Sequence, residues 1–234
     1  RIITPGTITE DTLLDSQRNN YLVAVAETQS GFGLAWLDMS TGEFQLQAVA
    51  ELDLSTALAR IEPGEILVSD KDPQRTNLAN GLEPWLKHLT YLPASRFDST
   101  NGKMRLEDFF GVRTLDAFGQ FTRGEVSAGG ALVDYVELTQ QGNRARIAPP
   151  RRLTDGSVME IDYATRRNLE LTMTLNGERH GSLLSVIDQT QTGAGARELA
   201  ARLAAPLRNL DEIKRRLDSV QYFVDDHTTR ETLR

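Results

Sequence analysis

The sequence contains no cysteine and only three histidines, and this shortage excludes several kinds of site. Without cysteine the chain has no disulfide, no thiolate zinc site and no cysteine nucleophile. The three histidines, His88, His180 and His227, are far apart and lack the HxxxH or HxH spacing of a metal site. No apolar run approaches the length that spans a membrane, and the chain opens at Arg1 without a visible signal peptide. We therefore expect no metal site and no membrane segment, and the lack of cysteine fits a reducing, cytoplasmic location.

The chain also has fewer basic than acidic residues. The 234 residues include 26 Lys and Arg against 33 Asp and Glu, which gives a net charge of −7. An independent DNA-binding module is usually basic, so the charge argues against that role. The sequence has neither a GxxxxGK[ST] phosphate loop nor a GxSxG nucleophile motif. The chain has 39% hydrophobic and 25% charged residues, a composition that predicts a globular protein. Its length predicts one large domain, or one domain and part of another.

The first half of the sequence alternates strand-like and helix-like segments. Residues 21–26 are apolar on both faces, as in a central strand, and residues 33–39 and 44–48 are predicted to form an antiparallel hairpin. The pattern then predicts a helix at 52–61, a strand at 65–68, a helix at 82–89, a strand from 91, a helix ending at 110 and a helix at 128–141. This order predicts an α/β mixed sheet with helices on its faces.

The glycine, arginine and proline residues of "GNRARIAPP" (142–150) mark a boundary. We assign residues 1–142 to the first domain, 143–158 to a linker and 159–234 to an all-α second domain. Helices are predicted at 162–175, 182–188 and 193–203, and another after the Asn209–Glu212 capping pair. Thr228 and Glu231 have capping-box spacing, which predicts a further helix. These helices make an incomplete bundle, so we expect a fragment of a longer protein.

The stretch "LDMSTGEF" (37–44) allows two interpretations of Asp38. In the first, its carboxylate accepts the amide hydrogen of Ser40 and stabilises a turn that Gly42 completes. In the second, it belongs to a two-metal nuclease site, which needs several converging carboxylates. The candidates for that site are Glu27, Asp38, Asp70, and Asp134 or Glu137. Acids at strand ends are also common for solubility, so the turn is the favoured interpretation.

Two other patterns have a structural and a functional interpretation. Gly193-Ala194-Gly195 at a helix start could bind phosphate, but close helix packing is favoured because no strand precedes it and no lysine accompanies it. Small basic groups could contact phosphates, but solvated faces and salt bridges are commoner. Those groups are Arg144 and Arg146, Arg151 and Arg152, Arg166 and Arg167, and Lys214, Arg215 and Arg216.

The second half contains two long segments, "IDYATRRNLEL" (161–171) and "GSLLSVIDQTQTGAGARELAARLAAPLRNLDEIKRRLDSVQYF" (181–223). Together they resemble the core domain of the MutS family of mismatch-recognition proteins. The first half agrees, since "RIITPGT" (1–7) resembles that family's interdomain linker, and "LDMSTGEF" and "SAGGALVDYVELTQ" (127–140) resemble its connector domain. No Phe is followed two positions later by Glu, so the family's Phe-x-Glu mismatch-reading motif is missing, as is its ATPase domain.

The resemblance implies a connector domain with a ribonuclease-H-like sheet but no nuclease site, followed by the start of the helical core. It implies no chemistry and no cofactor in this chain, with ATP and Mg expected only for the missing ATPase domain. It implies docking of MutL, for which Lys103, Met104 and Arg105 are the candidate residues. Arg166, Arg167 and Glu170 are candidates for an interdomain joint. The parent protein is expected to bind mismatched DNA and to form a homodimer.

Overall fold

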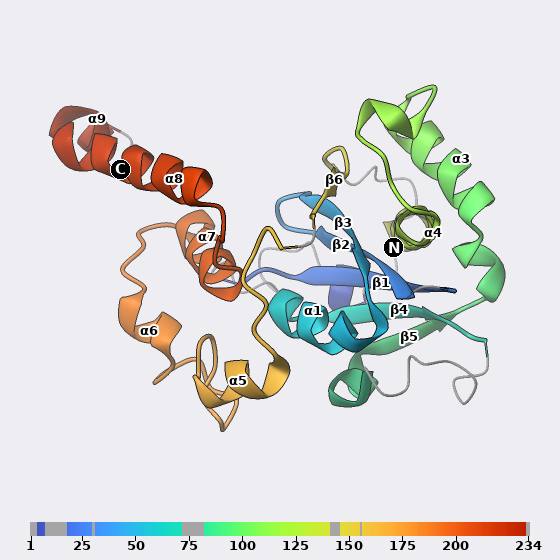
Figure 1. Cartoon of the computed structure of the whole chain (residues 1–234), viewed down its shortest axis with the longest axis horizontal. Helices are drawn as coiled ribbons and strands as arrows, with labels where there is room; N and C mark the ends of the chain where they lie inside the picture. The colour runs from blue at the N-terminus through green and yellow to red at the C-terminus, as the bar shows by residue number, and fades with distance from the viewer. Residues whose placement is uncertain are drawn as a thin grey trace. The chain divides into compact units, whose positions relative to one another are not determined.

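The computed structural model describes residues 4–7, 18–29, 31–71, 82–140, 146–154 and 156–232. The chain divides into two compact units, Arg1–Thr154 (unit 1) and Asp155–Arg234 (unit 2). Unit 1 contains a sheet with helices, and unit 2 is mainly helical (Figure 1). The prediction of a mixed α/β sheet followed by helices is confirmed. Across the described ranges, no helix is both long and apolar enough to cross a membrane.

Unit 1 is built on a six-stranded mixed sheet in the order β5-β4-β1-β2-β3-β6. Its strands are β1 (Tyr21–Thr28), β2 (Gly31–Asp38), β3 (Phe44–Val49), β4 (Glu65–Ser69), β5 (Leu89–Leu92) and β6 (Arg151–Arg152). The β1–β2 and β2–β3 pairs are antiparallel, whereas β4, β5 and β6 each join a neighbour in parallel. The predicted β2–β3 hairpin is therefore confirmed.

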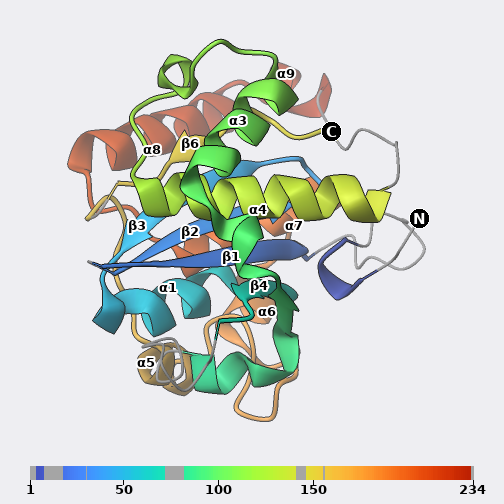
Figure 2. The same cartoon turned by 90° about the vertical axis from the view of Figure 1, so that its right-hand side faces the viewer.

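Helices cover both faces of this sheet, as Figure 2 shows for α4 above β1–β3 and α1 below them. Among the described residues of unit 1, the helices are α1 (Leu54–Ile61), α3 (Ser99–Phe110) and α4 (Arg123–Gln140), with short 3-10 turns η1 (Pro5–Thr7), η2 (Glu51–Asp53), η4 (Glu83–His88), η5 (Ala94–Phe97) and η6 (Leu115–Ala117). Alternate residues of β1 face the two layers: Leu22 and Ala24 pack with α3 and α4, and Val23 and Val25 pack with α1. This is why β1 is apolar on both faces.

Three elements of unit 1 differ from the sequence prediction. The segment predicted as a helix at 82–89 is the 3-10 helix η4. The helix predicted to begin at residue 128 begins at Arg123, because Thr122 and Glu125 form a capping box: the Thr122 amide donates to Glu125 Oε2 (2.6 Å), and the Glu125 amide donates to Thr122 Oγ1 (3.2 Å). Residues 151–152, assigned to a linker, form β6 beside β3, while the predicted boundary at 142–143 lies outside the described residues.

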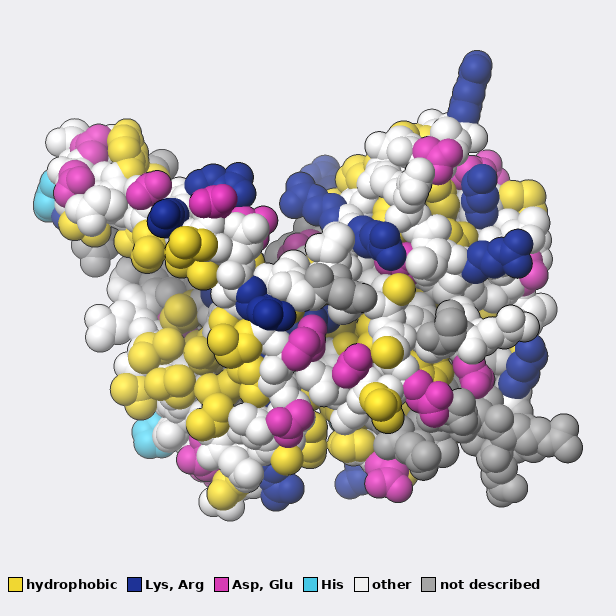
Figure 3. All heavy atoms as spheres, viewed as in Figure 1, with side chains coloured by type: hydrophobic (Ala, Val, Ile, Leu, Met, Phe, Trp, Pro, Cys, Tyr) yellow, Lys and Arg dark blue, Asp and Glu magenta, His cyan; other side chains and the backbone are white. Residues whose placement is uncertain are grey.

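Unit 2 consists of short helices joined by turns. They are α5 (Tyr163–Asn168), α6 (Leu183–Ile187), α7 (Gly193–Ala204), α8 (Leu210–Asp225) and α9 (His227–Thr232). Val158 and Leu207 form an isolated antiparallel bridge that closes the start of the unit onto the segment after α7. Apolar side chains remain exposed over α6 and along α8 (Figure 3), among them Val186 and Leu217.

Side-chain caps start most helices of unit 2. Asp162 accepts the Thr165 amide and starts α5, and hydrogen bonds from Thr165 lower the pKa of the Asp162 carboxyl. Asn209 accepts the amides at the second and third residues of α8, as its spacing predicted. The predicted last helix is present as α9, but its cap is Asp226, which accepts the Thr229 amide, and not Thr228, so the helix begins two residues earlier than predicted.

The prediction of a single helix at 162–175 is also wrong, because the helix ends at Asn168. Glu170 has a left-handed backbone with φ of 47°, which ends the helical path. Its carbonyl accepts the Leu183 amide (2.9 Å), and its Oε1 accepts the Leu175 amide (2.7 Å). These contacts replace helical hydrogen bonds, so α5 is a helix of six residues followed by a turn.

Candidate functional site

The candidate docking residues Lys103 and Met104 lie on the outer face of α3. The helix starts at Asp98, which accepts the Asn101 amide (2.8 Å), and it ends at Gly111 in a left-handed conformation. Met104 is 52% exposed, and Lys103 is exposed with its Nζ 3.7 Å from Glu107 Oε1. A flexible, apolar methionine exposed on a helix is a suitable contact for a protein partner.

Arg105 has a different position from its two neighbours. Its Nη1 donates to the Arg96 carbonyl (3.0 Å), and its Nε lies 3.5 Å from Asp134 Oδ1 on α4. Arg96 also forms an ion pair with Asp134. Arg105 therefore joins α3 to α4 and η5, which makes its replacement a structural change as well as a surface change.

Asp38 closes the turn between β2 and β3. Its Oδ1 accepts the Ser40 amide (2.8 Å) and the Ser40 hydroxyl (2.6 Å), which is an Asx turn. Gly42 has a φ of 77°, and an added Cβ would lie 2.1 Å from the Arg146 carbonyl oxygen. The Asp38 carboxylate is thus used within the turn.

The carboxylates proposed for a nuclease site do not converge. Asp38 lies opposite Tyr21 at the first residue of β1, whereas Glu27 is the sixth residue after Tyr21, roughly 20 Å away at ~3.3 Å per residue. Asp134 is paired with arginines on α3 and η5, and Asp70 Oδ1 accepts the Ala94 amide (2.9 Å).

Glu137 is exposed on α4. In the part of the chain that the structure describes, no group of three or more His, Asp or Glu residues could hold a metal ion. The nuclease interpretation of the sequence therefore receives no support from the geometry.

Of the three residues predicted for an interdomain joint, Arg166 is buried inside unit 2. Its Nε donates to the Ile161 carbonyl (3.2 Å), and its Nη2 donates to the Ala204 carbonyl at the end of α7. Arg167 is exposed on the same helix. The Arg166 guanidinium therefore connects α5 with α7, while Glu170 forms the turn after α5.

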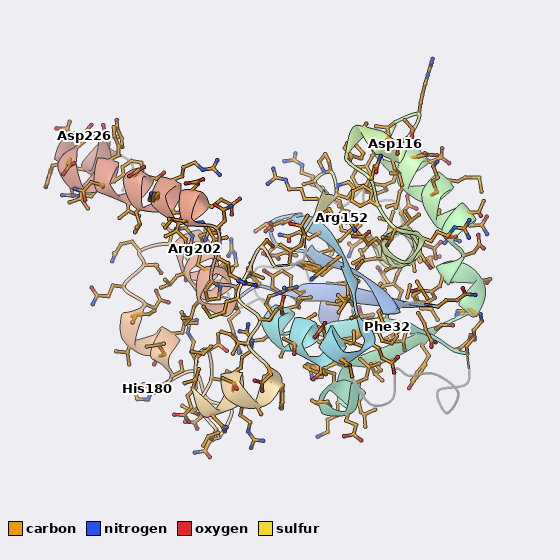
Figure 4. All side chains as sticks on the ribbon, viewed as in Figure 1. Phe32, Asp116, Arg152, His180, Arg202 and Asp226 are labelled. Carbon is orange, nitrogen blue, oxygen red and sulfur yellow. The ribbon has the colours of Figure 1, made fainter. Side chains whose placement is uncertain are left out.

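The remaining basic groups that the structure describes come from separate elements of the two units. Arg152, labelled in Figure 4, comes from β6 and pairs with Glu125 (Nε to Oε1, 2.8 Å). Arg215 lies on the exposed side of α8, 4.0 Å from Glu212. Arg144 lies outside the described residues. At the glycine pair of α7, the Gly195 amide already donates to Thr192 Oγ1 (3.0 Å).

A buried carboxylate that sequence reasoning missed lies at the start of β4. Glu65 is 2% exposed, and its Oε1 accepts the Tyr135 hydroxyl (2.7 Å) and the Thr90 hydroxyl (2.7 Å). Its Oε2 accepts the Gly6 amide (2.9 Å). No local pattern marks this residue, because its three donors come from distant parts of the sequence.

The free energy of unfolding is expected to fall as the pH rises from 10 to 12. Burial and the Glu65 carboxylate raise the pKa of Tyr135 from 10.0 to about 12. Between pH 10 and 12 the folded chain therefore retains the Tyr135 proton while the unfolded chain loses it. This contribution to the free energy of unfolding is complete below pH 10 and is lost as the pH rises through 12. It amounts to about 2 to 3 kcal/mol. Urea denaturation at stepped pH measures this loss.

Tyr135→Phe is the control, since it keeps the ring and removes the titrating group. The difference in unfolding free energy between the native chain and the variant should shrink over this pH range. A difference that stays constant from pH 9 to pH 12 would contradict the prediction.

Comparison with known proteins agrees with the division of the chain. Residues 20–148 match the family model described as MutS domain II, and residues 164–234 match the one described as MutS domain III. The first match lies within unit 1, and the second lies within unit 2.

Curated relatives are similar over nearly the whole chain. A protein of Roseobacter denitrificans is 46% identical over 227 residues, one of Rhodopseudomonas palustris (strain BisB5) is 50% identical over 239, and one of Ruegeria pomeroyi is 48% identical over 234. Each carries the name DNA mismatch repair protein MutS. The matches cover 97 to 100% of this chain but only 26 to 27% of the relatives, so the chain spans about a quarter of their length.

Proposed function

This chain belongs to the MutS family, and on that premise we propose that it is a connector and partner-docking part of a mismatch-recognition ATPase of DNA mismatch repair. The observation that carries the docking role is the exposed pair Lys103 and Met104 on the outer face of α3. The proposed partner is MutL, which the family resemblance implies.

The sheet of unit 1 is proposed to be ribonuclease-H-like. Its three consecutive antiparallel strands, β1 to β3, and the parallel strands β4 and β5 added beside β1 support this proposal. The dispersed carboxylates support a non-enzymatic role for this chain. Mismatched DNA, ATP and Mg are proposed to bind other parts of the whole protein, which we propose to be a cytoplasmic homodimer.

Charge reversal in Lys103→Glu is expected to raise the Kd for MutL about tenfold. The side chain is exposed, and its ion pair with Glu107 spans 3.7 Å in solvent, so its loss should cost little stability. Titration of labelled MutL with the native chain and the variant measures the change. Lys103 is preferred to Arg105 because Arg105 also holds α3 against α4.

The matched control is Lys87→Glu, which makes the same charge change at an exposed lysine of η4. It should leave the Kd within about twofold of the native value. Equal weakening by both variants would indicate a general charge effect, and unchanged binding in Lys103→Glu would remove the docking surface.

A further inference from the structure

A short segment before β1 is held tightly against unit 1. This incoming segment, residues 4–7, contains η1 and the buried Thr7. The Gly6 amide donates to Glu65 Oε2 (2.9 Å), and a Cβ at Gly6 would lie 2.7 Å from the Glu65 Cβ. The close approach and the hydrogen bond together fix this segment on β4.

The C-terminal half of α4 completes this contact. The Tyr135 hydroxyl donates to the same Glu65 carboxylate, and Gln140 Nε2 donates to the Thr7 carbonyl (3.3 Å). Both side chains are buried. The incoming segment is therefore bound by two residues of α4, one directly and one through Glu65.

The other end of α4 binds the segment that follows it in the chain. This outgoing segment, residues 146–153, lies along β3, where the Ala148 amide donates to the Gly42 carbonyl (2.8 Å) and the Leu153 amide donates to the Leu46 carbonyl (2.8 Å). Between them, Arg152 donates to Glu125, which is fully buried in the first turn of α4. A buried carboxylate requires such a partner, so this pair fixes the outgoing segment on the helix start.

At its second residue, Gly124, and near its middle, at Gly130, α4 is in backbone contact with its neighbours. A Cβ at Gly33 of β2 would lie 1.9 Å from the Gly124 carbonyl carbon, and a Cβ at Gly130 would lie 2.3 Å from the Gly102 Cα of α3. Because the residues at both crossings are glycines, backbone meets backbone there with no side chain between. Since packed interiors transmit displacement, α4 is a rigid body between the two segments it binds.

We propose that α4 fixes the positions of the incoming and outgoing segments of unit 1, by Glu65, Tyr135 and Gln140 at one end and by the Glu125–Arg152 pair at the other. The separation between Glu125 and Gln140 along the helix is about 22 Å at ~1.5 Å per residue. The inference rests on the proposed connector function, since a connector transmits position only if the chain enters and leaves it at fixed points.

Hydrogen exchange on the whole chain, followed by mass spectrometry, tests this arrangement. Glu65→Gln replaces one carboxylate oxygen by an NH2 group, which cannot accept the Gly6 amide while the remaining oxygen accepts the Tyr135 and Thr90 hydroxyls. Exchange at Gly6 and Thr7 should therefore rise at least about tenfold while Ala148 and Leu153 stay protected. Glu125→Gln should have the reverse effect. Amides of β1 serve as the internal reference in both variants.

Two outcomes overturn the proposal. If Glu125→Gln leaves the outgoing segment protected, pairing with β3 alone holds that segment. If Glu65→Gln and Tyr135→Phe both leave the incoming segment protected, α4 has no part in binding it. Faster exchange across β1 in Glu65→Gln would mean that the whole sheet is destabilised. Tyr135→Phe then tests the contact alone, because it keeps the aromatic packing and removes only the hydroxyl.

The hydrogen-exchange test of α4 and the MutL-binding test of Lys103 can fail independently of one another. The ion pair of Lys103 is with Glu107 of its own helix, so unchanged MutL binding in Lys103→Glu would end the docking role and leave the exchange pattern as predicted. Conversely, unprotected segments in the native chain would end the role of α4 without altering the docking test.

Discussion

Replacing Gly33 by alanine is expected to prevent unit 1 from folding, or to lower its free energy of unfolding by at least about 3 kcal/mol. The new Cβ would lie 1.9 Å from the Gly124 carbonyl carbon and 2.1 Å from its oxygen. These are backbone atoms of α4, so no side-chain rotation relieves the overlap. The helix would have to move away from β2, and Gly130 in turn holds it against Gly102 of α3.

Denaturation followed by tryptophan fluorescence measures this effect, because both tryptophans, Trp36 and Trp85, lie in unit 1. Gly111→Ala is the control. Gly111 has a φ of 65° and no atom within 4 Å of an added Cβ, so only the left-handed backbone is penalised, by roughly 1 to 2 kcal/mol. A loss in Gly33→Ala no larger than the loss in Gly111→Ala would contradict the prediction, because it would show that α4 moves to make room for the new Cβ at little cost.

Replacing Arg166 by methionine is expected to destabilise unit 2 by about 3 kcal/mol. Arg166 is 8% exposed, and its guanidinium donates to the carbonyls of Ile161 and Ala204. Methionine retains much of the apolar stem but leaves these carbonyls without a charged donor. The contact between α5 and α7 should therefore be lost first.

Arg167→Met is the matched control, since it makes the same change at the exposed neighbour and should stay within about 0.5 kcal/mol. Unfolding of unit 2 is followed by far-ultraviolet circular dichroism, with tryptophan fluorescence reporting on unit 1 in the same sample. Arg166→Met should lower the helical signal at a denaturant concentration that leaves the fluorescence unchanged. Equal effects at positions 166 and 167 would contradict the structural role of Arg166.

Short-range features of this chain could be predicted because their partners are close in the sequence. The β2–β3 hairpin follows from alternating apolar residues on both sides of a glycine turn. Asn209 starts α8 because its side chain reaches amides two and three residues away. The capping box at Thr122 and Glu125 is equally local, so the sequence also contains the signal for the start of α4.

Other features could not be predicted in this way, because their hydrogen-bond partners are distant in sequence. Nothing local distinguishes Glu65 from the surface acids, yet its donors Gly6 and Tyr135 are 59 and 70 residues away. The same holds for Arg166, which is 38 residues from its acceptor Ala204. The left-handed turn at Glu170 depends on Leu175 and Leu183, so the periodicity of 162–175 indicated a helix that the fold does not form.

The sequence by itself determined the class of fold and the family, since apolar periodicity, caps and turns depend on neighbours within a few residues, and the motifs that carry the resemblance are linear. Only the tertiary structure decided what the polar groups do. It separated Asp38 from Glu27, turned Arg105 and Arg166 inward, and brought Glu65 under the incoming segment. The physical reason is that a buried charge is stable only where the whole fold supplies its partners, and those partners come from elements far apart in the chain.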